Sequence, residues 1–536
     1  LNGEFSIVRS YNSKGTDQNS MFGRGWSFNY DQSLSQMEDG SILFMRGDGS
    51  YLFFTKNEDG TYTAPDGYVY DLEAVSYKDT YHDYIGWEVT DADQSVWSFD
   101  KYGMLRFVTD VNGFKTTLDY DEEYNLNKIM TPSGKEFGIK QNPFGYIEKL
   151  TLPDGGVVSY KYDDKGNLIS VKNPNGDTRE YQYDADSRMT SWKDENGNTV
   201  IKNTYDKEGR VTKQVDANKG EATFEYGKFT TTTIDNEGNK TVYQYDEQYR
   251  TISITYPDGT TCKKSYNAEN QLEKEVTAAG TKSYTYDAFG NVATETREDG
   301  KRAFYTYNEQ NKLISVTGYN GETVTYTYDA AGNMTVSTKP DGTKLTHAYD
   351  SLHRMISQTD GRGVTTTYTY DGPNMTGYVD GNGNKWTFTY DAMNRALTMT
   401  DPLGHTTSNG YDAAGRLISK TAANGGVTAY ILDGVGNITS STDAMGNTTT
   451  YTYDKMYNML SGTDPKGNTI SYKYDKNNQQ VEATDAKGNT ITYAYDSMGR
   501  VIEETNADFG TKLYVYDKAG NLERYTDGEG HAIVSE

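Results

Sequence analysis

One pattern recurs along most of the chain. When the sequence is aligned on a Tyr-Asp pair, the first aligned position is Phe99, the last is Tyr516, and sixteen of the twenty intervals between neighbours are 21 residues. Each aligned segment is one copy of the repeat. Self-similarity at such a period is typical of proteins in which every copy is a supersecondary unit that packs on its neighbours. The repeat therefore favours one extended architecture over several separate domains.

Each copy predicts two strands and two tight turns. In the copy around Tyr328, residues 324–328 alternate with a period of two and are rich in Thr and Tyr, as a strand requires. Residues 329–333 read Asp-Ala-Ala-Gly-Asn. Asp first and Gly fourth are preferred by a type I turn followed by a left-handed residue. A second strand over 334–338 and a second turn over 339–342 lead into the next copy.

The number of strands requires the sheet to wind. About twenty copies give on the order of 40 strands, and open sheets of more than about 10 strands curl or split. A β-propeller would use two copies per four-stranded blade, but odd and even copies would then differ, and ten blades would exceed the usual four to eight. Odd and even copies show no such difference. The sequence therefore predicts an all-β fold in which one long antiparallel sheet of 21-residue hairpins winds continuously.

Tyrosine replaces aliphatic residues in this chain. Only 34% of the 536 residues are hydrophobic, but there are 48 Tyr and 54 Gly. A tyrosine ring can pack in a core while its hydroxyl finds a hydrogen-bond partner. The sequence therefore predicts a wet, tyrosine-lined core.

Charge and cysteine content exclude several classes of partner and site. The net charge of −25 argues against nucleic acid and anionic membranes, since both would be repelled. The single cysteine, Cys262, excludes an internal disulfide and a cysteine-based zinc site. No apolar run approaches the roughly 18 residues of a membrane span. The first residues, LNGEF, include neither a starting Met nor a signal peptide, so we expect a segment of a longer protein.

The copies resemble a known family. The segments YKYDDKGNLISV from Tyr160, YTYDAFGNVATE from Tyr284, GYDAAGRLISK from Gly410 and YAYDSMGRVIEE from Tyr493 are similar to the YD or Rhs repeat. The residues that we expect to carry this repeat are Tyr162, Asp163, Tyr286, Asp287, Gly290, Tyr328, Asp329, Gly332, Tyr453, Asp454, Tyr495, Asp496, Gly499, Tyr516, Asp517 and Gly520.

The N-terminal part resembles the region that precedes Rhs arrays. Residues 8–34 open with an RSYNS motif and contain Gly23, Gly25 and Trp26 in a Gly-x-Gly-Trp motif. The resemblance implies two parts, an N-terminal Rhs region with degenerate β repeats over 1–98 and a continuous repeat array over 99–536. The closing core region of the family, with its aspartyl self-cleavage site, has no match here. We expect the array to be truncated at its C-terminus.

The resemblance also implies a function. In Rhs polymorphic toxins, insecticidal toxin complexes and teneurins, such repeats form a long sheet wound into a hollow spiral barrel or shell. In the bacterial toxins the shell encloses a C-terminal effector domain. By resemblance, this chain is a non-enzymatic shell segment of a secreted or surface-bound bacterial protein, and its partner is an effector that the present sequence lacks. No cofactor or metal is implied.

Individual side chains suggest weaker alternatives. Tyrosine pairs such as Tyr326 with Tyr328 share a strand face and could form a platform for sugars, but cross-strand packing is the more economical interpretation. The turn that begins at Asp380 lacks the glycine and glutamate spacing of a calcium loop. Cys262 has no catalytic partner in the sequence. The five histidines, which show no ligand spacing, are His82, His347, His353, His405 and His531.

Three functional hypotheses remain in order. A shell that encloses an effector comes first. A surface adhesion or carbohydrate-binding protein comes second, with cell-surface glycans as partners. An enzyme is a distant third, because carboxylates recur in every turn and carry no specificity for catalysis.

Overall fold

The structure is a computed structural model that describes residues 6–17, 19–65, 67–78, 83–111 and 113–534. All regular elements in this described part are β-strands. The chain forms two compact units, and each unit is made of three separate segments of the chain. Unit 1 contains Leu1–Met189, Tyr307–Val316 and Glu322–Gly425, and unit 2 contains Thr190–Thr306, Thr317–Gly321 and Gly426–Glu536.

The N-terminal region of unit 1 forms three small antiparallel sheets. β1 pairs with β4, β2 pairs with β3, and β5 to β8 follow one another in a four-stranded sheet. The strands are β1 (Arg9–Tyr11), β2 (Asn19–Ser20), β3 (Gly23–Arg24), β4 (Trp26–Phe28), β5 (Ser33–Gln36), β6 (Ile42–Met45), β7 (Tyr51–Lys56) and β8 (Tyr62–Thr63).

The remaining strands of unit 1 belong to the repeat array, where each strand pairs antiparallel with the next one in sequence. The first group is β9 (Tyr70–Lys78), β10 (Asp83–Asp91), β11 (Val96–Phe99), β12 (Leu105–Thr109), β13 (Lys115–Tyr120), β14 (Leu126–Met130), β15 (Glu136–Gln141), β16 (Ile147–Thr151), β17 (Val157–Tyr162), β18 (Leu168–Lys172) and β19 (Thr178–Tyr183). The second group is β33 (Thr323–Tyr328), β34 (Met334–Thr338), β35 (Lys344–Tyr349), β36 (Met355–Thr359), β37 (Thr365–Asp371), β38 (Asn374–Val379), β39 (Lys385–Tyr390), β40 (Ala396–Thr400), β41 (Thr406–Tyr411) and β42 (Leu417–Thr421).

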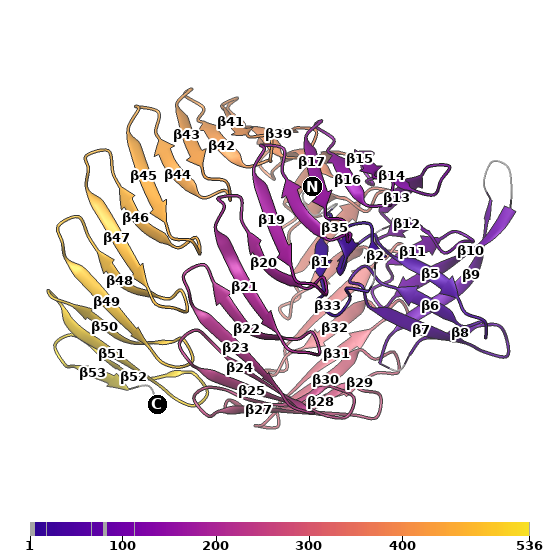
Figure 1. The fold of residues 1–536 in the computed structure, drawn as a ribbon, viewed down its shortest axis with the longest axis horizontal. Helices are drawn as coiled ribbons and strands as arrows, with labels where there is room; N and C mark the ends of the chain where they lie inside the picture. The colour runs from indigo at the N-terminus through magenta and orange to yellow at the C-terminus, as the bar shows by residue number, and fades with distance from the viewer. Residues whose placement is uncertain (1–5, 18, 66, 79–82, 112, 535–536) are drawn as a thin grey trace. The chain divides into compact units, whose positions relative to one another are not determined.

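Unit 2 is built in the same way, and Figure 1 shows its hairpins from β43 to β53 side by side. One group is β21 (Thr199–Tyr205), β22 (Val211–Asp216), β23 (Glu221–Tyr226), β24 (Thr230–Ile234), β25 (Lys240–Tyr245), β26 (Thr251–Thr255), β27 (Thr261–Tyr266), β28 (Leu272–Thr277), β29 (Gly280–Tyr286) and β30 (Val292–Arg297). The other is β43 (Val427–Leu432), β44 (Ile438–Thr442), β45 (Thr448–Tyr453), β46 (Met459–Thr463), β47 (Thr469–Tyr474), β48 (Gln480–Thr484), β49 (Thr490–Tyr495), β50 (Val501–Asn506), β51 (Gly510–Tyr516), β52 (Leu522–Thr526) and β53 (Ala532–Val534). Three strands straddle the unit boundaries, namely β20 (Met189–Lys193), β31 (Arg302–Tyr307) and β32 (Leu313–Thr317).

The predicted hairpin is present in detail. The copy around Tyr328 places one strand at β33 and the next at β34, close to the bounds that the sequence predicts. Tyr326 lies opposite Ser337, and the register shifts by a β-bulge between Thr327 and Tyr328. Such a bulge follows from a type I turn that ends in a left-handed residue. Strands β9 to β53 are slightly more numerous than the about 40 predicted.

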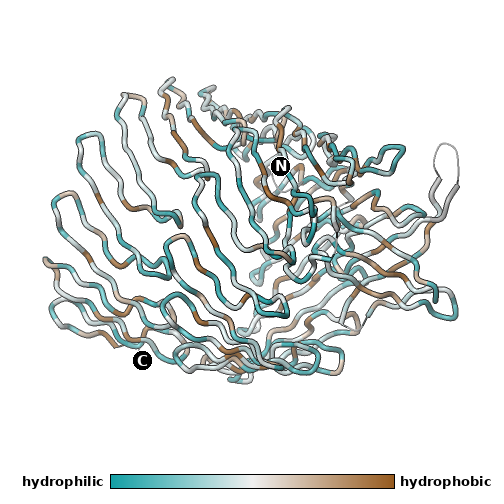
Figure 2. The backbone as a smooth tube through the Cα atoms, in the orientation of Figure 1, coloured by the Kyte–Doolittle hydropathy of each residue, from teal (hydrophilic) through white to brown (hydrophobic). Residues whose placement is uncertain are grey.

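The two faces of the array differ in composition. In β33 the side chains of Thr325 and Thr327 are exposed, whereas those of Tyr326 and Tyr328 are half-buried. We call the side that carries the paired tyrosines the tyrosine face. Figure 2 shows that hydrophobic positions lie on the strands and that the turns are largely hydrophilic.

The hydrophobic core lies where the N-terminal region covers the tyrosine face of the first copies. Phe22, Phe28, Phe44 and Phe54 have at most 1% of their surface exposed. The ring of Phe22 lies 5.1 Å from that of Tyr160, and the ring of Phe44 lies 5.9 Å from that of Phe99. Beyond Val200, the only buried hydrophobic residues in the described part of the chain are Cys262 and Ala303.

Candidate functional site

In most Tyr-Asp pairs the tyrosine holds neighbouring copies together. The hydroxyl of Tyr328 donates a hydrogen bond of 2.7 Å to the backbone carbonyl of Leu313, fifteen residues earlier. Burial raises the pKa of the Tyr328 phenol, so the hydroxyl stays protonated and keeps its role as a donor. The same bond, 14 or 15 residues back, is made by Tyr162 (2.8 Å), Tyr286 (2.8 Å), Tyr453 (2.9 Å), Tyr495 (2.6 Å) and Tyr516 (2.9 Å).

The aspartate of each pair organises the turn that follows it, which we call the YD turn. Oδ1 of Asp329 accepts hydrogen bonds from the N–H groups of Ala331 (3.0 Å) and Asn333 (2.9 Å), and Oδ2 accepts from the Asn333 side chain (2.9 Å). The Asn333 side-chain bond is the main reason that the pKa of Asp329 is lowered. The fourth turn residue, Gly332, has φ of 84°, where a residue with a Cβ is strained.

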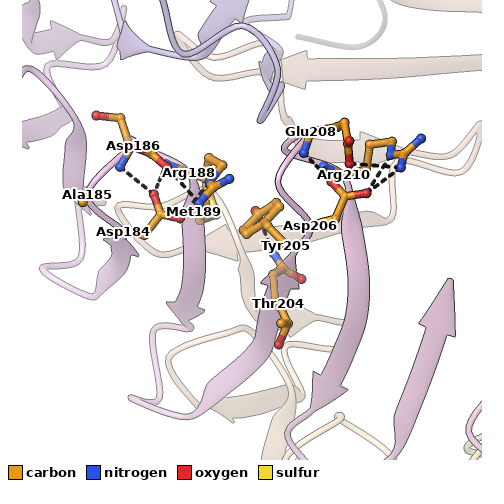
Figure 3. A network of polar contacts seen from close by, with 12 residues as sticks. Asp184, Ala185, Asp186, Arg188, Met189, Thr204, Tyr205, Asp206, Glu208 and Arg210 are labelled. Atoms are coloured by element: carbon orange, nitrogen blue, oxygen red, sulfur yellow. Dashed lines mark hydrogen bonds and ion pairs between the residues drawn. The ribbon is translucent and has the colours of Figure 1, made fainter. Parts of the chain in front are cut away.

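Other copies show the same turn with an asparagine or an arginine in the fifth position. Aspartates that bind the fifth residue are Asp163, Asp287, Asp454, Asp496 and Asp517. Glycines with positive φ are Gly290 (86°), Gly499 (79°) and Gly520 (90°). Figure 3 shows two arginine examples, where Nε of Arg188 donates to Asp184 and Nε of Arg210 donates to Asp206, each at 2.8 Å.

A second kind of contact joins turns that are far apart in sequence. In unit 1, the side-chain amide of Asn175 donates a hydrogen bond of 2.8 Å to Oδ2 of Asp412. A guanidinium nitrogen of Arg395 donates a hydrogen bond of 3.2 Å to Oδ2 of Asp154. In unit 2, the side-chain amide of Asn196 donates a hydrogen bond of 3.0 Å to Oδ2 of Asp433. We call this row of contacts the cross-turn seam.

The seam has a constant offset. Unit 2 adds bonds from Asn218 to Asp454 (2.8 Å) and from Asn477 to Asp235 (2.7 Å). The sequence separations of the amide bonds are between 236 and 242 residues. Each contact joins the second turn of one copy to the YD turn of the copy twelve positions later in the register. Within each unit the array therefore returns alongside itself.

Close contacts in the N-terminal Gly-x-Gly-Trp motif require its two glycines. Gly23 has φ of 92°, and a Cβ on this residue would lie 2.4 Å from the carbonyl oxygen of Gly166. The next residue, Arg24, donates its backbone N–H to that same oxygen at 3.0 Å. Gly25 has φ of 71°, and a Cβ there would lie 2.9 Å from the ring of Tyr11. Only glycine allows this close approach.

Trp26 completes the contact. Its indole Nε1–H donates 3.0 Å to the hydroxyl of Tyr183, its ring lies 5.2 Å from that of Tyr181, and only 8% of its surface is exposed. The hydroxyl of Tyr11 donates to the carbonyl of Ser187 at 2.9 Å. The N-terminal region is thus fastened to the tyrosine face through aromatic rings and hydrogen bonds.

Sequence reasoning missed the seam and the partners of the N-terminal motif. One sequence signal could have indicated the seam: in some YD turns another residue replaces the glycine at the fourth position. Tyr457 occupies that position with φ of 70°, which is unfavourable for a bulky residue, and its hydroxyl donates 2.9 Å to Asp194 across the seam. A non-glycine residue at a left-handed position can therefore mark a side chain that is used elsewhere.

The remaining candidates have local partners. Sγ of Cys262 lies 3.5 Å from a carboxylate oxygen of Glu275, and burial raises the pKa of the thiol, so the thiolate is disfavoured. Nδ1 of His347 lies 3.1 Å from the sulfur of Met355. Three exposed or half-buried side chains bond within or beside their turns, namely His353 with Asn333, His405 with Asp401 and His531 with Asp527.

Two further findings concern metal-binding groups and membrane-spanning helices among the described residues. Oδ1 of Asp380 accepts from backbone N–H groups of its own turn. Over the ranges that the structure describes, no group of three His, Cys, Asp or Glu side chains could hold a metal ion. Those ranges also contain no helix with the length and hydrophobicity of a membrane span. His82 lies outside the described residues.

Comparison with solved structures identifies the fold. A TcdB2-TccC3 crystal structure matches with a TM-score of 0.62 and 13% identity over 86% of this chain and 35% of that chain. A structure of the Photorhabdus luminescens Tc holotoxin pore matches with a TM-score of 0.53 and 14% identity over 94% of this chain and 30% of that chain. The chain thus spans about a third of the length of these chains. At this identity the likeness concerns the fold, and the predicted fold class is confirmed.

Comparison with family models identifies the repeats. A model described as "Domain of unknown function (DUF6531)" matches residues 2–54. The model described as "RHS Repeat" matches residues 147–178, 162–199, 183–222, 266–302, 307–344, 374–406, 411–444, 433–469 and 474–508, which together make up about half of the chain. The repeating tyrosine, aspartate and glycine of the hairpins described above are the features that these segments share, and the chain belongs to the RHS repeat family.

Proposed function

We propose that this chain is a non-enzymatic segment of a β shell in a secreted or surface-bound bacterial protein, and that the shell encloses and delivers a C-terminal effector of its parent chain. The observation that carries the proposal is the packing of the N-terminal region on the tyrosine face. There, polypeptide of this same chain lies against Tyr160 and Tyr181, which become 5% and 7% exposed. The tyrosine face can therefore hold a polypeptide.

Later copies leave the same face uncovered. In unit 2, Tyr451 and Tyr453 are half-buried, while Thr450 and Thr452 on the opposite side are exposed. A surface of rings with polar tips contacts a passenger without the strong adhesion of an aliphatic surface, because the hydroxyls carry hydrogen-bonding capacity at the tips of the rings. The hydroxyl of Tyr453, for example, is already bonded to the carbonyl of Ile438. This composition suits a lining that must also release its contents.

The cross-turn seam supports enclosure. A sheet that returns alongside itself with a constant offset has one face turned inward, whereas a flat sheet presents both faces to solvent. The matched TcdB2-TccC3 structure supports the same class of architecture at the level of fold. The division at residue 98 between the N-terminal Rhs region and the array stays a prediction. In the proposal both parts act as one container.

Protease protection tests this proposal. The parent protein would be produced in full, with the natural residues that follow Glu536, and digested with a protease of broad specificity. The control is the same C-terminal polypeptide made alone. We expect it to be degraded when alone and to survive within the parent. A matched variant that opens the seam, Asn196→Ala with Asn218→Ala, should reduce this protection.

The opposite result favours the second hypothesis. If the C-terminal polypeptide is cut at once while the array stays intact, the array encloses nothing and displays its surface. Adhesion would then replace encapsulation as the function, and the localisation at the bacterial surface would follow from adhesion instead of export of an effector.

A further inference from the structure

A pocket lies in unit 1 between the N-terminal sheets and the first array strands. Its volume is about 310 Å³. Three sides are formed by the chain around β1 and β4, by the β6–β7 hairpin and by strands β9 to β11. This volume is at the lower end of ligand pockets, which span ~300–1,000 Å³.

Aromatic rings form the apolar part of the pocket. The ring of Phe44 is buried and lies 6.2 Å from the ring of Tyr70 and 6.2 Å from that of Trp97. The rings of Tyr70 and Trp97 are 6.3 Å apart with an interplanar angle of 51°. Both are half-buried, so part of each ring faces the pocket. Two inclined rings above a buried third provide a surface for the C–H groups of a compact ligand.

Polar groups at the pocket keep hydrogen-bonding capacity. Neither the hydroxyl of Tyr70 nor the indole N–H of Trp97 makes a hydrogen bond within the part of the chain that the structure describes. One carboxylate oxygen of Asp91 accepts from the N–H of Ala92 at 2.6 Å, which leaves the other oxygen for a ligand. The guanidinium of Arg46 donates to the hydroxyl of Ser50 at 3.4 Å and lies 3.7 Å from the carboxylate of Asp48, so its remaining N–H groups are available.

The geometry of the pocket is maintained by a close backbone approach. Gly47 follows β6, and a Cβ on this residue would lie 2.8 Å from both Cα and the carbonyl oxygen of Asn29. The side chain of Asn29 is itself bonded, accepting from the N–H of Val8 (2.9 Å) and donating to the carbonyl of Ser6 (2.8 Å). The pocket wall is therefore rigidly tied to the N-terminal sheet.

The charges select the kind of ligand. The lining carries one guanidinium, Arg46, and two carboxylates, Asp48 and Asp91, so an anion is disfavoured. A purely apolar ligand would bury the Tyr70 hydroxyl and the Trp97 N–H without partners, which is costly. A simple cation would lie beside Arg46. A neutral ring with hydroxyls around its edge and C–H groups on its faces satisfies both the rings and the polar groups.

We propose that this pocket binds a neutral saccharide ring, with the sugar faces against Tyr70 and Trp97 and its hydroxyls bonded to Asp91, Asp48 and Arg46. The site lies at the N-terminal end of the tyrosine face, where Trp97 takes the register position of Tyr326, and it does not depend on an enclosed effector. It would give the N-terminal end of the protein an affinity for polysaccharide or glycan surfaces.

Ligand-observed NMR tests the proposal on the whole chain. Saturation-transfer spectra would be recorded with the methyl glycosides of glucose, galactose, mannose and N-acetylglucosamine, and with tetramethylammonium and inorganic phosphate as charged probes. We expect at least one glycoside to bind, with a dissociation constant of about 1 mM, as for one small ligand with few contacts. Neither charged probe should bind at the same concentration.

Three variants locate the binding. Tyr70→Phe keeps the ring and removes the hydroxyl, so affinity should fall about 2- to 10-fold, and Trp97→Phe should remove the change in tryptophan fluorescence on binding. Tyr249→Phe, at a residue 73% exposed and outside the pocket, is the matched control and should bind like the wild type.

Any of three results would overturn the proposal. The first is the absence of glycoside binding by the wild-type chain up to about 50 mM, which is far above the expected constant. The second is binding that Tyr70→Phe and Trp97→Phe leave unchanged, since the sugar would then occupy another surface. Binding of tetramethylammonium in place of glycosides would make the pocket a cation site and also refute it.

Discussion

The packing of the N-terminal region on the tyrosine face depends on Gly23, and replacing it with alanine tests that dependence. The Cβ of Gly23→Ala would lie 2.4 Å from the Gly166 oxygen, whereas real contacts of a Cβ are almost never below 3.0 Å. The two segments must separate by about 0.6 Å. The bond from the Arg24 N–H to the same oxygen, now 3.0 Å, would then approach about 3.6 Å, which is too long for a hydrogen bond.

Two costs add in this variant. A residue with a Cβ at φ of 92° costs about 1–2 kcal/mol. The lost hydrogen bond adds about 0.5–1.5 kcal/mol. The matched control is Gly145→Ala, because Gly145 has φ of 82° and a Cβ added there would have nothing within 4 Å. Gly145→Ala therefore has the backbone strain at positive φ but loses no hydrogen bond.

Hydrogen exchange measured by mass spectrometry reads out the difference. We expect the peptide that contains Arg24 to lose protection by about 10- to 400-fold in Gly23→Ala, which corresponds to the sum of the two costs, about 1.5–3.5 kcal/mol of local stability. The same peptide should be unchanged in Gly145→Ala, where any loss stays in its own turn. Equal exchange in the two variants, or full protection of Arg24 in Gly23→Ala, would refute the account of the close approach.

Three further outcomes follow from single side chains. Burial raises the pKa of Asp31 from 3.8 to about 6, so between these values the folded chain holds a proton that the unfolded chain lacks; the stability contribution of this group should grow as the pH falls from about 7 to about 4, and Asp31→Asn should remove it in thermal melts. Tyr328→Phe should lower stability by about 1 kcal/mol through loss of its carbonyl bond, while Tyr326→Phe, whose hydroxyl has no hydrogen bond within the described residues, should not. Asn196→Ala should increase hydrogen exchange around Asp433 about tenfold, because it removes the contact across the seam.

Controls distinguish these effects from general destabilisation. For the seam, the control is Asn447→Ala, since the amide of Asn447 bonds to Asp443 of its own turn; exchange near Asp433 should then stay as in the wild type. A melting temperature that depends on pH equally in wild type and Asp31→Asn would contradict the first prediction. Equal losses in the two tyrosine variants would contradict the second.

The local structure of the copies could be predicted from the sequence because it depends on near neighbours. The period of two in 324–328 fixes which side chains share a face, and the Asp and Gly of 329–333 fix the turn through bonds that span four residues or fewer. For the same reason the all-β class and the approximate number of strands followed from counting copies. The bulge before Tyr328 is a consequence of the same turn.

The contacts of Trp26 and the offset of the seam could not be predicted in this way. Trp26 bonds Tyr183, and Asn196 bonds Asp433, across 157 and 237 residues. Such an offset is the sum of small twists and bends over many strands, and no local pattern encodes that sum. The pocket beside Trp97 likewise exists only because three sheets meet there. The sequence by itself thus determines the hairpin and its repetition, because the hydrogen bonds of a turn act within five residues. Which distant turns and side chains meet depends on the folded array as a whole, because its curvature accumulates from strand to strand.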